Sequence, residues 1–536
     1  MKYVIGIDFG TLSARAVVVE AESGKEVMQH TSEYAHAVLE RNLPSGKELI
    51  LGTALQVPSD YLASLSESIR TAISKAGISP TDVIAMGIDF TASTMLPIDE
   101  NGTPLCEKEE FVDEPYAYVK LWKHRTATAE ADEITTTAHR MGEPFIKAAG
   151  GKVSAELMLP KVLETLRRAP HVYDAAHRFV EAADWISLVL TGKETRSPVF
   201  AGYKAGWSAD RGYPSNEFFK ALDPRLDGFI GTKIPKSVEP TIAAAAGRLT
   251  KKGSEITGLC EGTVVALPMI DAHASLAGLG VCNGGDMVMI IGTSTCHILN
   301  STERTDIEGI FGYVKDGVFP GLYTYESGQS AVGDSFDWFV KNALPASYDN
   351  EAKERNLSTH QLLTEKAEKL GIGESGLVAL DWWSGNRSIL ADSSLKGMIY
   401  GLTLRTRPEE IYRALLESTV FGARVIIEQH EKFGVEINSV TAAGGIANKN
   451  ALLMQIFADV LGRDIKIASS TQSGALGSAV YAAAAAGIYG SVEEASKAFA
   501  NPCEKVYHPI KENTEAYDVL YKKYRALHDY FAKNKF

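Results

Sequence analysis

The sequence predicts an α/β protein with two similar domains that flank a cleft, and three observations support this prediction. At 536 residues the chain is too long for one hydrophobic core and suits two large domains. An apolar, β-branched strand ends at Gly10-Thr11 and leads into a second strand, and the same arrangement recurs at Gly292-Thr293. A third strand, late in the chain, ends at Gly444-Gly445 and leads into a helix.

The two Gly-Thr turns have the composition of phosphate-binding turns. In YVIGIDFGTLSARAVVVE and DMVMIIGTSTCHILN, the glycine lets backbone N–H groups face an anion, and neighbouring hydroxyl groups can assist. One such turn alone is most often an ordinary hairpin, and Arg15 alone is as well explained by a strand residue facing solvent. Because the turn is duplicated, we expect two similar lobes to hold the phosphates of one nucleotide. The candidate phosphate ligands are Gly10, Thr11, Ser13, Arg15, Gly292, Thr293 and Ser294.

The segment SVTAAGGIANKNALLMQIFADVLGRDIKIASS predicts a third part of the nucleotide site. A β-branched run ends at Gly444-Gly445, Asn448 is expected to be a helix N-cap, and an apolar helix face follows at 3.6-residue spacing. Glycines at the exit of a strand let a flat ring approach the backbone. We therefore interpret this turn as a shelf for adenine, with an ordinary strand-to-helix turn as the alternative.

The remaining periodicity gives a coarse plan of the chain. Strands are expected within 3–33 and over 83–90, with a helix at about 59–76 between them. Further helices are expected at 129–141, 158–169 and 183–192, and a charged helix from about 511. Asn283-Gly284-Gly285 reads as a turn before a strand, so we expect domains at 1–283 and 284–536.

Composition limits the partners of the protein. The formal net charge of −13 and the absence of a long basic run argue against nucleic acid or an anionic membrane as the main partner. A polyanionic nucleotide must then be met locally, by backbone donors, a metal ion and a few cations. Five cysteines without metal-ligand spacing, and no apolar stretch near the roughly 18 residues of a membrane span, predict a soluble cytoplasmic protein with reduced thiols.

In the order DFGT, GTS and GGIANKN, the chain resembles the FGGY carbohydrate kinases, a branch of the actin-like ATPase superfamily. The segment GMIYGLTLRTRPEEIYRALLES strengthens the resemblance, although Leu415 stands where the family prefers a smaller or β-branched residue. A weaker family signature keeps Lys161 but has Glu164 where a Trp is usual. The resemblance implies two ribonuclease-H-like domains and the transfer of a phosphoryl group from ATP, with Mg²⁺, to a sugar hydroxyl.

The resemblance also assigns roles to acidic residues. It implies that Asp271, in PMIDAHASLAG, is the catalytic base, and that Asp8 helps to hold Mg²⁺ through water. A helix N-cap is the alternative for Asp271, and a strand-end cap is the alternative for Asp8. Gly333 and Asp337 fall where the family has nucleotide contacts.

Within the family, the strings IDFTASTMLPID, PMIDAHASLAGLG and GTSTCHILN are similar to those of members that act on L-ribulose, so a ketopentose is the expected partner. Other members acting on xylulose or ribitol, and a non-metabolic actin-like ATPase, are the alternatives. Each of these functions is compatible with a homodimer. For Lys204 a solvated surface charge, and for Trp122 a core aromatic, are the plainer interpretations. The residues implied to bind the sugar are Thr91, Ala92, Ser93, Trp122, Lys204, Asp271 and Glu326.

Overall fold

A computed structural model describes residues 1–470, 472–501, 503 and 505–534, and these divide into two compact units. Unit 1 comprises Met1–Cys282, Tyr313–Thr324 and Gln472–Asn501. Unit 2 comprises Asn283–Gly312, Tyr325–Thr471 and Pro502–Phe536. The predicted boundary between 283 and 284 lies one residue after the point where the chain first passes from unit 1 to unit 2. The prediction did not include the two later segments, 313–324 and 472–501, that also belong to unit 1.

Unit 1 is built on a twisted mixed sheet with the strand order β3-β2-β1-β5-β10-β9, and β11 also pairs with β5. The strands β1, β2 and β3 are antiparallel neighbours, while β5 runs parallel to β1, β10 and β11. The expected strands within 3–33 and over 83–90 are confirmed. The bounds are β1 Tyr3–Phe9, β2 Ser13–Glu20, β3 Glu26–Glu33, β5 Val83–Phe90, β9 Ala245–Arg248, β10 Val264–Ala266 and β11 Met269–Ile270.

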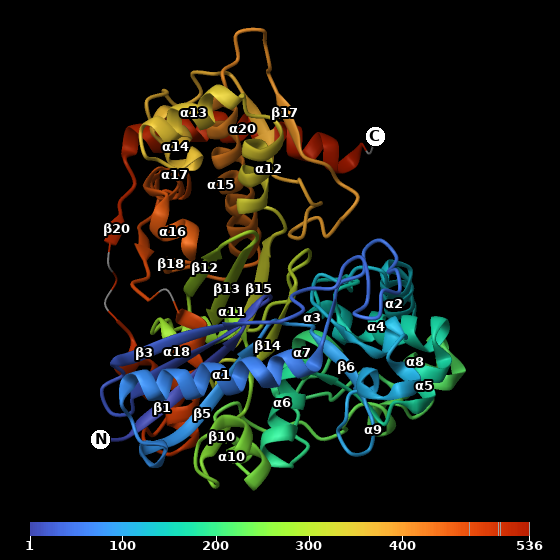
Figure 1. Ribbon diagram of the computed structural model, residues 1–536. Helices are drawn as coiled ribbons and strands as arrows, with labels where there is room; N and C mark the ends of the chain where they lie inside the picture. Colours follow the sequence, from blue (N-terminus) through green and yellow to red (C-terminus); the bar gives the residue numbers. More distant parts are fainter. Residues whose placement is uncertain (471, 502, 504, 535–536) are drawn as a thin grey trace. The chain divides into compact units, whose positions relative to one another are not determined.

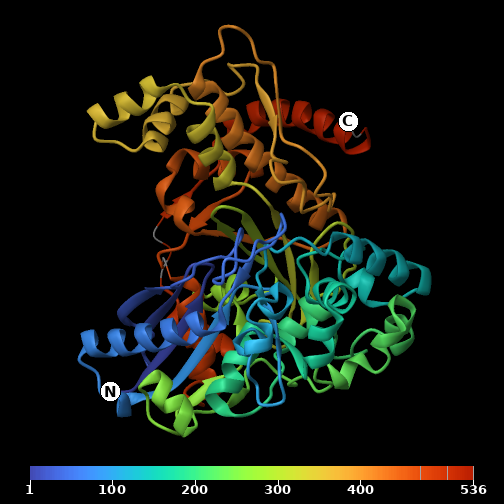
Figure 2. The same cartoon turned by 45° about the vertical axis from the view of Figure 1, so that its right-hand side comes forward.

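Helices cover both faces of this sheet. The helix α1 (Pro58–Ala76) packs its Tyr61 ring against Phe9 and Phe90, with centroids 6.1 Å and 4.9 Å apart. Residues 6 and 8 of β1 point to the opposite face, because side chains alternate along a strand. That face carries α18 (Ser473–Ala485), which lies beside the N-terminal strands although it is distant in sequence (Figures 1 and 2).

Two glycines let α18 approach the sheet closely. Gly6 and Gly87 lie opposite each other in β1 and β5. A Cβ on Gly6 would overlap the carbonyl oxygen of Ala475, and a Cβ on Gly87 would overlap that of Ser478. The backbone of the helix therefore rests directly on these two positions.

We expect Gly87→Ala to lower the free energy of unfolding of unit 1 by about 1–3 kcal/mol or more, because the added methyl group overlaps backbone atoms that cannot move independently. Thermal unfolding followed by circular dichroism measures this loss. Gly371→Ala is the matched control, since the nearest atom to its Cβ is the end of the flexible Glu374 side chain at 3.3 Å. Equal unfolding temperatures for the two variants would contradict the close packing of α18.

Unit 1 also contains a four-stranded sheet with the order β4-β7-β6-β8, surrounded by short helices. The expected helices at 129–141, 158–169 and 183–192 are confirmed as α2, α4 and α6. The strands are β4 Leu55–Gln56, β6 Met95–Ile98, β7 Val119–Lys120 and β8 Arg178–Glu181. Besides α1 and α18, the helices of unit 1 are α2 Thr128–Met141, α3 Phe145–Ala148, α4 Met158–Arg168, α5 Pro170–Ala175, α6 Ala182–Thr191, α7 Pro198–Ala205, α8 Asn216–Leu222, α9 Phe229–Thr232, α10 Lys251–Thr257, α11 Asp271–Gly278 and α19 Val492–Phe499.

The second large sheet repeats the pattern of a hairpin followed by parallel strands, in the order β14-β15-β13-β12-β18-β19-β20, where β14 is Gly312–Lys315. The charged helix expected from about 511 is confirmed as α20. The strands are β12 Asp286–Ile291, β13 Thr295–Ser301, β15 Tyr323–Gln329, β18 Ser439–Ala443, β19 Ile465–Ile467 and β20 Lys505–Tyr507, with a separate hairpin of β16 Val378–Leu380 and β17 Met398–Tyr400. The helices are α12 Gly333–Asn342, α13 Ala346–Glu354, α14 Thr359–Glu368, α15 Pro408–Lys432, α16 Gly445–Lys449, α17 Ala451–Leu461 and α20 Lys511–Lys533. Among the described residues, no helix has the length and apolar character needed to cross a bilayer.

Candidate active site

Three strands of unit 1 end in register at one edge of its sheet. Phe9 at the end of β1 pairs with Phe90 at the end of β5, and Phe90 pairs with Ile270 at the end of β11. The next residues along each strand are Gly10, Thr91 and Asp271. The predicted phosphate turn, sugar loop and base therefore lie side by side. The carboxyl ends of parallel strands are where open α/β sheets bind ligands.

The Gly10 turn closes the β1–β2 hairpin. The N–H of Gly10 donates to the carbonyl of Ser13 at 3.0 Å, and Ser13, at the start of β2, is buried. A Cβ on Gly10 would meet no atom closer than 3.5 Å, and its φ is not positive. Neither packing within unit 1 nor backbone conformation thus explains a glycine here.

The turn is linked to the residues expected to bind sugar. Thr11 Oγ1 accepts a hydrogen bond from Nε1 of Trp122 at 3.2 Å, so Trp122 is half-buried beside the phosphate turn instead of lying in a core. The N–H of Thr91 donates to the carbonyl of Phe9 at 3.1 Å. These bonds bring the phosphate turn and the start of the sugar loop, residues 91–94, together.

The sugar loop itself is tightly held. The hydroxyl groups of Thr91 and Thr94 are 2.8 Å apart, and Ala92 between them is half-buried. Ser93 has a φ of +56°, which is uncommon for a residue with a side chain. Strained backbone of this kind often marks a binding site.

Carboxylates gather where α18 begins, around Gly474. A Cβ on Gly474 would lie 3.3 Å from Oδ1 of Asp89 and 3.6 Å from Cγ of Asp8. Asp8 also pairs with Nη1 of Arg15 at 2.7 Å, so Arg15 is tied to Asp8 and is not a plain solvent-facing residue. The backbone carbonyl oxygen of Asp271 is 3.6 Å from that Cβ position, and the negative charge of Asp271 contributes to raising the pKa of Asp89.

Asp89 was missed in the sequence, although it lies in the string IDFTAST. It is completely buried, and its Oδ2 accepts a hydrogen bond from Ser478 of α18 at 2.6 Å. Burial and the negative charge of Asp8 raise the pKa of Asp89 well above its usual value, and the Ser478 hydrogen bond opposes this shift. Its Oδ1 accepts no hydrogen bond from the described residues. An orphaned buried carboxylate oxygen beside further carboxylates is a fitting environment for Mg²⁺, which prefers oxygen ligands.

Asp271 is the first residue of α11, and Ile270 is the N-cap. Its Oδ1 accepts a hydrogen bond from the N–H of Ala272 at 2.7 Å, and the residue is only half-buried. The N-cap alternative for Asp271 is therefore wrong. His273, two residues on, is buried against the ring of Tyr203 with centroids 4.6 Å apart, as a structural residue would be.

Lys204 lies in the last turn of α7 and is 1% exposed. Its ammonium group lies 5.4 Å from the ring centroid of Tyr203. A solvated surface charge is therefore the wrong interpretation for Lys204.

The Gly292 turn of unit 2 also closes a hairpin, and it is one residue shorter than the Gly10 turn. The N–H of Gly292 donates to the carbonyl of Ser294 at 2.9 Å, and a Cβ on Gly292 would meet no atom closer than 3.8 Å. The N–H of Val332 donates to the carbonyl of Thr293 at 2.7 Å, and that of Gly333 donates to Gly292 at 3.0 Å. The N-terminus of α12 is thereby fixed against this turn.

The glycine pair after β18 lies next to the Gly292 turn, because Ile290 and Ala443 are paired near the ends of β12 and β18. Gly444 has a φ of +97°, and its Cβ would lie 2.5 Å from the carbonyl oxygen of Ile291. A Cβ on Gly445 would meet nothing within 4 Å. Gly444 is thus required by the fold, and Gly445 is open to a ligand.

The N-cap expected at Asn448 is wrong. Asn448 lies inside α16, and Asn450 caps α17 by accepting a hydrogen bond from the N–H of Leu453 at 3.0 Å. The prediction treated two helices as one. The first of them, α16, has five residues and ends before the apolar helix α17 begins.

The other predicted residues of unit 2 have partners of their own. The half-buried Asp337 pairs with Lys341 at 2.8 Å and with Nε2 of His360 at 2.9 Å, and the Lys341 hydrogen bond lowers the pKa of this carboxyl. Glu326 in β15 is 4% exposed and accepts a hydrogen bond from Arg387 at 3.3 Å. Of these two, Glu326 is the buried polar group.

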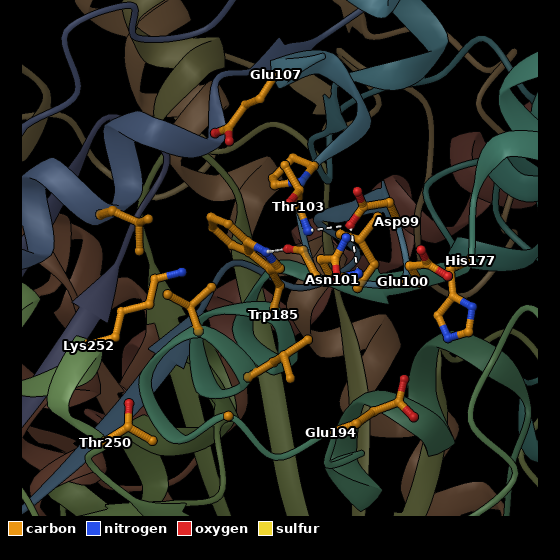
Figure 3. A pocket seen from close by; sticks show the side chains of 17 residues that line it. Asp99, Glu100, Asn101, Thr103, Glu107, His177, Trp185, Glu194, Thr250 and Lys252 are labelled. Carbon is orange, nitrogen blue, oxygen red and sulfur yellow. Dashed lines mark hydrogen bonds between the residues drawn. The ribbon is translucent and has the colours of Figure 1, made fainter.

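A separate pocket of about 490 Å³ in unit 1 contains none of the predicted site residues (Figure 3). Its polar groups hold the turn after β6. Oδ1 of Asp99 accepts from the N–H groups of Asn101 and Thr103, both at 2.9 Å, and Nε1 of Trp185 donates to the carbonyl of Gly102 at 2.9 Å. The strand-end residues, and not this pocket, form the candidate active site of unit 1.

Comparisons with known proteins identify relatives that match nearly the whole chain. The ribulokinase of Halalkalibacterium halodurans is 47% identical over 538 residues, which cover 99% of this chain and 95% of the relative. That of Geobacillus thermodenitrificans is 47% identical over 539 residues, with 100% and 95% covered. The solved xylulose kinase of Lactobacillus acidophilus shares the fold, with a TM-score of 0.81, 19% identity and 99% of both chains covered.

Two family models cover most of the chain. The model described as the N-terminal domain of the FGGY family of carbohydrate kinases matches residues 3–278. The model of the C-terminal domain matches residues 287–486. Together with the full-length relatives, these matches show that the chain belongs to the FGGY family of carbohydrate kinases.

Proposed function

We propose that the chain is a ribulokinase, which transfers the γ-phosphoryl group of ATP to L-ribulose and releases L-ribulose 5-phosphate and ADP. The observation that carries this proposal is the register of β1, β5 and β11, which brings Gly10, Thr91 and Asp271 to one sheet edge. The two relatives named ribulokinase, each 47% identical along nearly the whole chain, support the choice of sugar.

We assign the steps of the reaction to the predicted residues as follows. Asp271 accepts the proton of the attacking sugar hydroxyl, whose oxygen forms the new bond to the γ-phosphorus as the bond to the bridging oxygen of ADP breaks. The turns at Gly10 and Gly292 donate backbone N–H groups to phosphate oxygens. Gly444 and Gly445 leave the backbone flat for the adenine ring. Further residues are proposed to assist in nucleotide binding: the side chains of Thr11, Ser13, Thr293, Ser294, Asn448 and Asp337, and the backbone of Gly333.

Mg²⁺ belongs to the proposal because the carboxylates of Asp8 and Asp89 supply the oxygen-rich environment that the ion prefers. When bound, the ion neutralises charge on the phosphates. Asp8 would hold it through water, and Arg15 fixes the carboxylate of Asp8 from one side.

The sugar is proposed to bind at Thr91, Ala92, Ser93, Trp122, Lys204, Asp271 and Glu326. The hydroxyl, carbonyl and ammonium groups of this set match a polyol with a keto group, and small Ala92 leaves room for the carbon chain. We place the enzyme in the cytoplasm, because the reaction consumes ATP and the described cysteines form no disulfide.

We expect ADP release that depends on L-ribulose. A coupled assay over the four ketopentoses, ribitol and other pentitols, with and without Mg²⁺, measures it. The highest kcat/KM should fall on L-ribulose. A maximum on xylulose or ribitol would assign another sugar within the family, and ATP turnover without any sugar would favour a non-metabolic ATPase.

A further inference from the structure

Buried charges in unit 1 form a cluster linked to the sugar loop. The cluster consists of side chains that are each at most 3% exposed, namely Lys161, Glu181, Asp184, Arg196 and Lys204. Buried charges are costly unless they are balanced by opposite charges. Arg196 and Asp184 form an ion pair at 2.9 Å, and the positive charges of Arg196, Lys161 and Lys204 all act on Glu181.

Lys161 of α4 holds the sugar loop directly. Its ammonium group donates to the carbonyl of Ser93 at 2.7 Å and to that of Leu121 at 2.8 Å. Ser93 is the residue with the left-handed φ of +56°, a strained conformation that persists only where the surrounding structure fixes it. Leu121 directly precedes Trp122. Lys161 therefore joins the strained loop to the segment that carries Trp122.

Glu181 stands at the end of β8, opposite Met95 at the start of β6. The next residue, Ala182, donates its N–H to the carbonyl of Thr94 at 2.7 Å, so Glu181 is anchored to the end of the sugar loop. The side chain of Glu181 is 0% exposed, and neither of its oxygens has a hydrogen-bond partner among the described residues. A buried carboxylate without hydrogen bonds requires a reason to be there.

The electrostatic environment supplies that reason. Burial lowers the pKa of Lys161 to about 7, and the charge of Glu181 is the largest influence that opposes this fall. Burial likewise raises the pKa of Glu181 to about 7, against the positive charges of Arg196, Lys161 and Lys204. Further charged groups act on the pair: Glu156, Lys120 and Lys204 on Lys161, and Asp184 on Glu181. Each member of the pair thus helps to keep the other charged in an apolar environment.

We propose that Glu181 is a positioning residue for sugar binding: its charge keeps the ammonium group of Lys161 in place, and Lys161 holds Ser93 in the conformation of the sugar loop. This inference rests on the proposed function, because it takes residues 91–94 as the sugar loop. Glu181 acts through Lys161 and touches neither substrate.

The first test compares Michaelis constants in the full-length enzyme. Glu181→Gln should raise the KM for L-ribulose by about 10-fold or more, while the KM for ATP changes by less than about 3-fold. Glu164→Gln is the matched control, because Glu164 is equally buried on α4 but bonds to Thr126 at 2.9 Å and not to the loop. The control should leave both constants within about 3-fold. A general loss of stability would change both constants together.

The second test asks whether Glu181 acts through Lys161. Lys161→Met should itself raise the KM for L-ribulose, and adding Glu181→Gln to it should raise KM no further. The double variant contains no uncompensated Lys161 charge. Its KM, compared with that of Lys161→Met, therefore tests the inference even if Glu181→Gln alone does not fold. Multiplying effects, or an unchanged KM in Glu181→Gln, would overturn the inference. Failure of the wild-type enzyme to phosphorylate any sugar would instead refute the proposed function.

Discussion

Asp271→Asn should lose about 10²–10⁴-fold in kcat, roughly 3–5 kcal/mol of barrier, because the amide cannot take the proton of the attacking hydroxyl. MgATP binding should stay near that of the wild type, and sugar binding should weaken only modestly. Stopped-flow turnover, with nucleotide affinity from calorimetry, separates these effects. The side chain occupies the first helical position of α11, so its removal costs the helix only about 0.3–1 kcal/mol of dipole stabilisation.

Ser275→Ala is the matched control on the same helix. Ser275 donates a hydrogen bond to the carbonyl of Asp271 at 3.2 Å, so the variant perturbs α11 near the base and leaves the carboxylate intact. Its kcat should remain within about 3-fold of wild type. If Asp271→Asn turned over as fast as Ser275→Ala, Asp271 would be a structural residue and the base would have to be another group.

The two Gly-Thr hairpins and the strands within 3–33 and over 83–90 could be predicted because local signals specify them. The β-branched runs ending at Gly10 and Gly292 define hairpins through residues adjacent in sequence, and the helix periodicity of 158–169 needs no distant partner. Asn448 shows the limit of such signals. Two asparagines lie within three residues, and only the break between α16 and α17 makes Asn450 the cap.

The residues that sequence reasoning missed depend on contacts between distant segments. Asp89 becomes part of the site because α18, nearly 400 residues later, places Ser478 against it. Gly6 and Gly87 have no turn to explain them, and their role is visible only once that helix lies on the sheet. Glu181 likewise shows no pattern of its own, since its neighbours Lys161 and Lys204 come from separate helices.

Gly10→Val and Gly292→Val should each weaken ATP binding by at least about 100-fold, or roughly 2.7 kcal/mol, while leaving the units folded. The side chain would occupy the space in which a phosphate approaches the backbone N–H groups. The structure gives these two positions no internal reason to be glycine, because their nearest Cβ contacts would be 3.5 Å and 3.8 Å away. Isothermal titration with ATP and Mg²⁺ measures the affinity, and thermal unfolding measures the fold.

Gly444→Ala provides the contrast, since its φ of +97° and the carbonyl oxygen of Ile291 at 2.5 Å from the new Cβ make that glycine a requirement of the fold. This variant should lose stability first, and nucleotide affinity only as a consequence. Gly10→Ala, which adds the smallest possible side chain, should fall between wild type and Gly10→Val in affinity with an unchanged unfolding temperature. Wild-type affinity in a well-folded Gly10→Val or Gly292→Val variant would show that this turn does not bind phosphate. A branched side chain there would block any ligand that lies against the backbone.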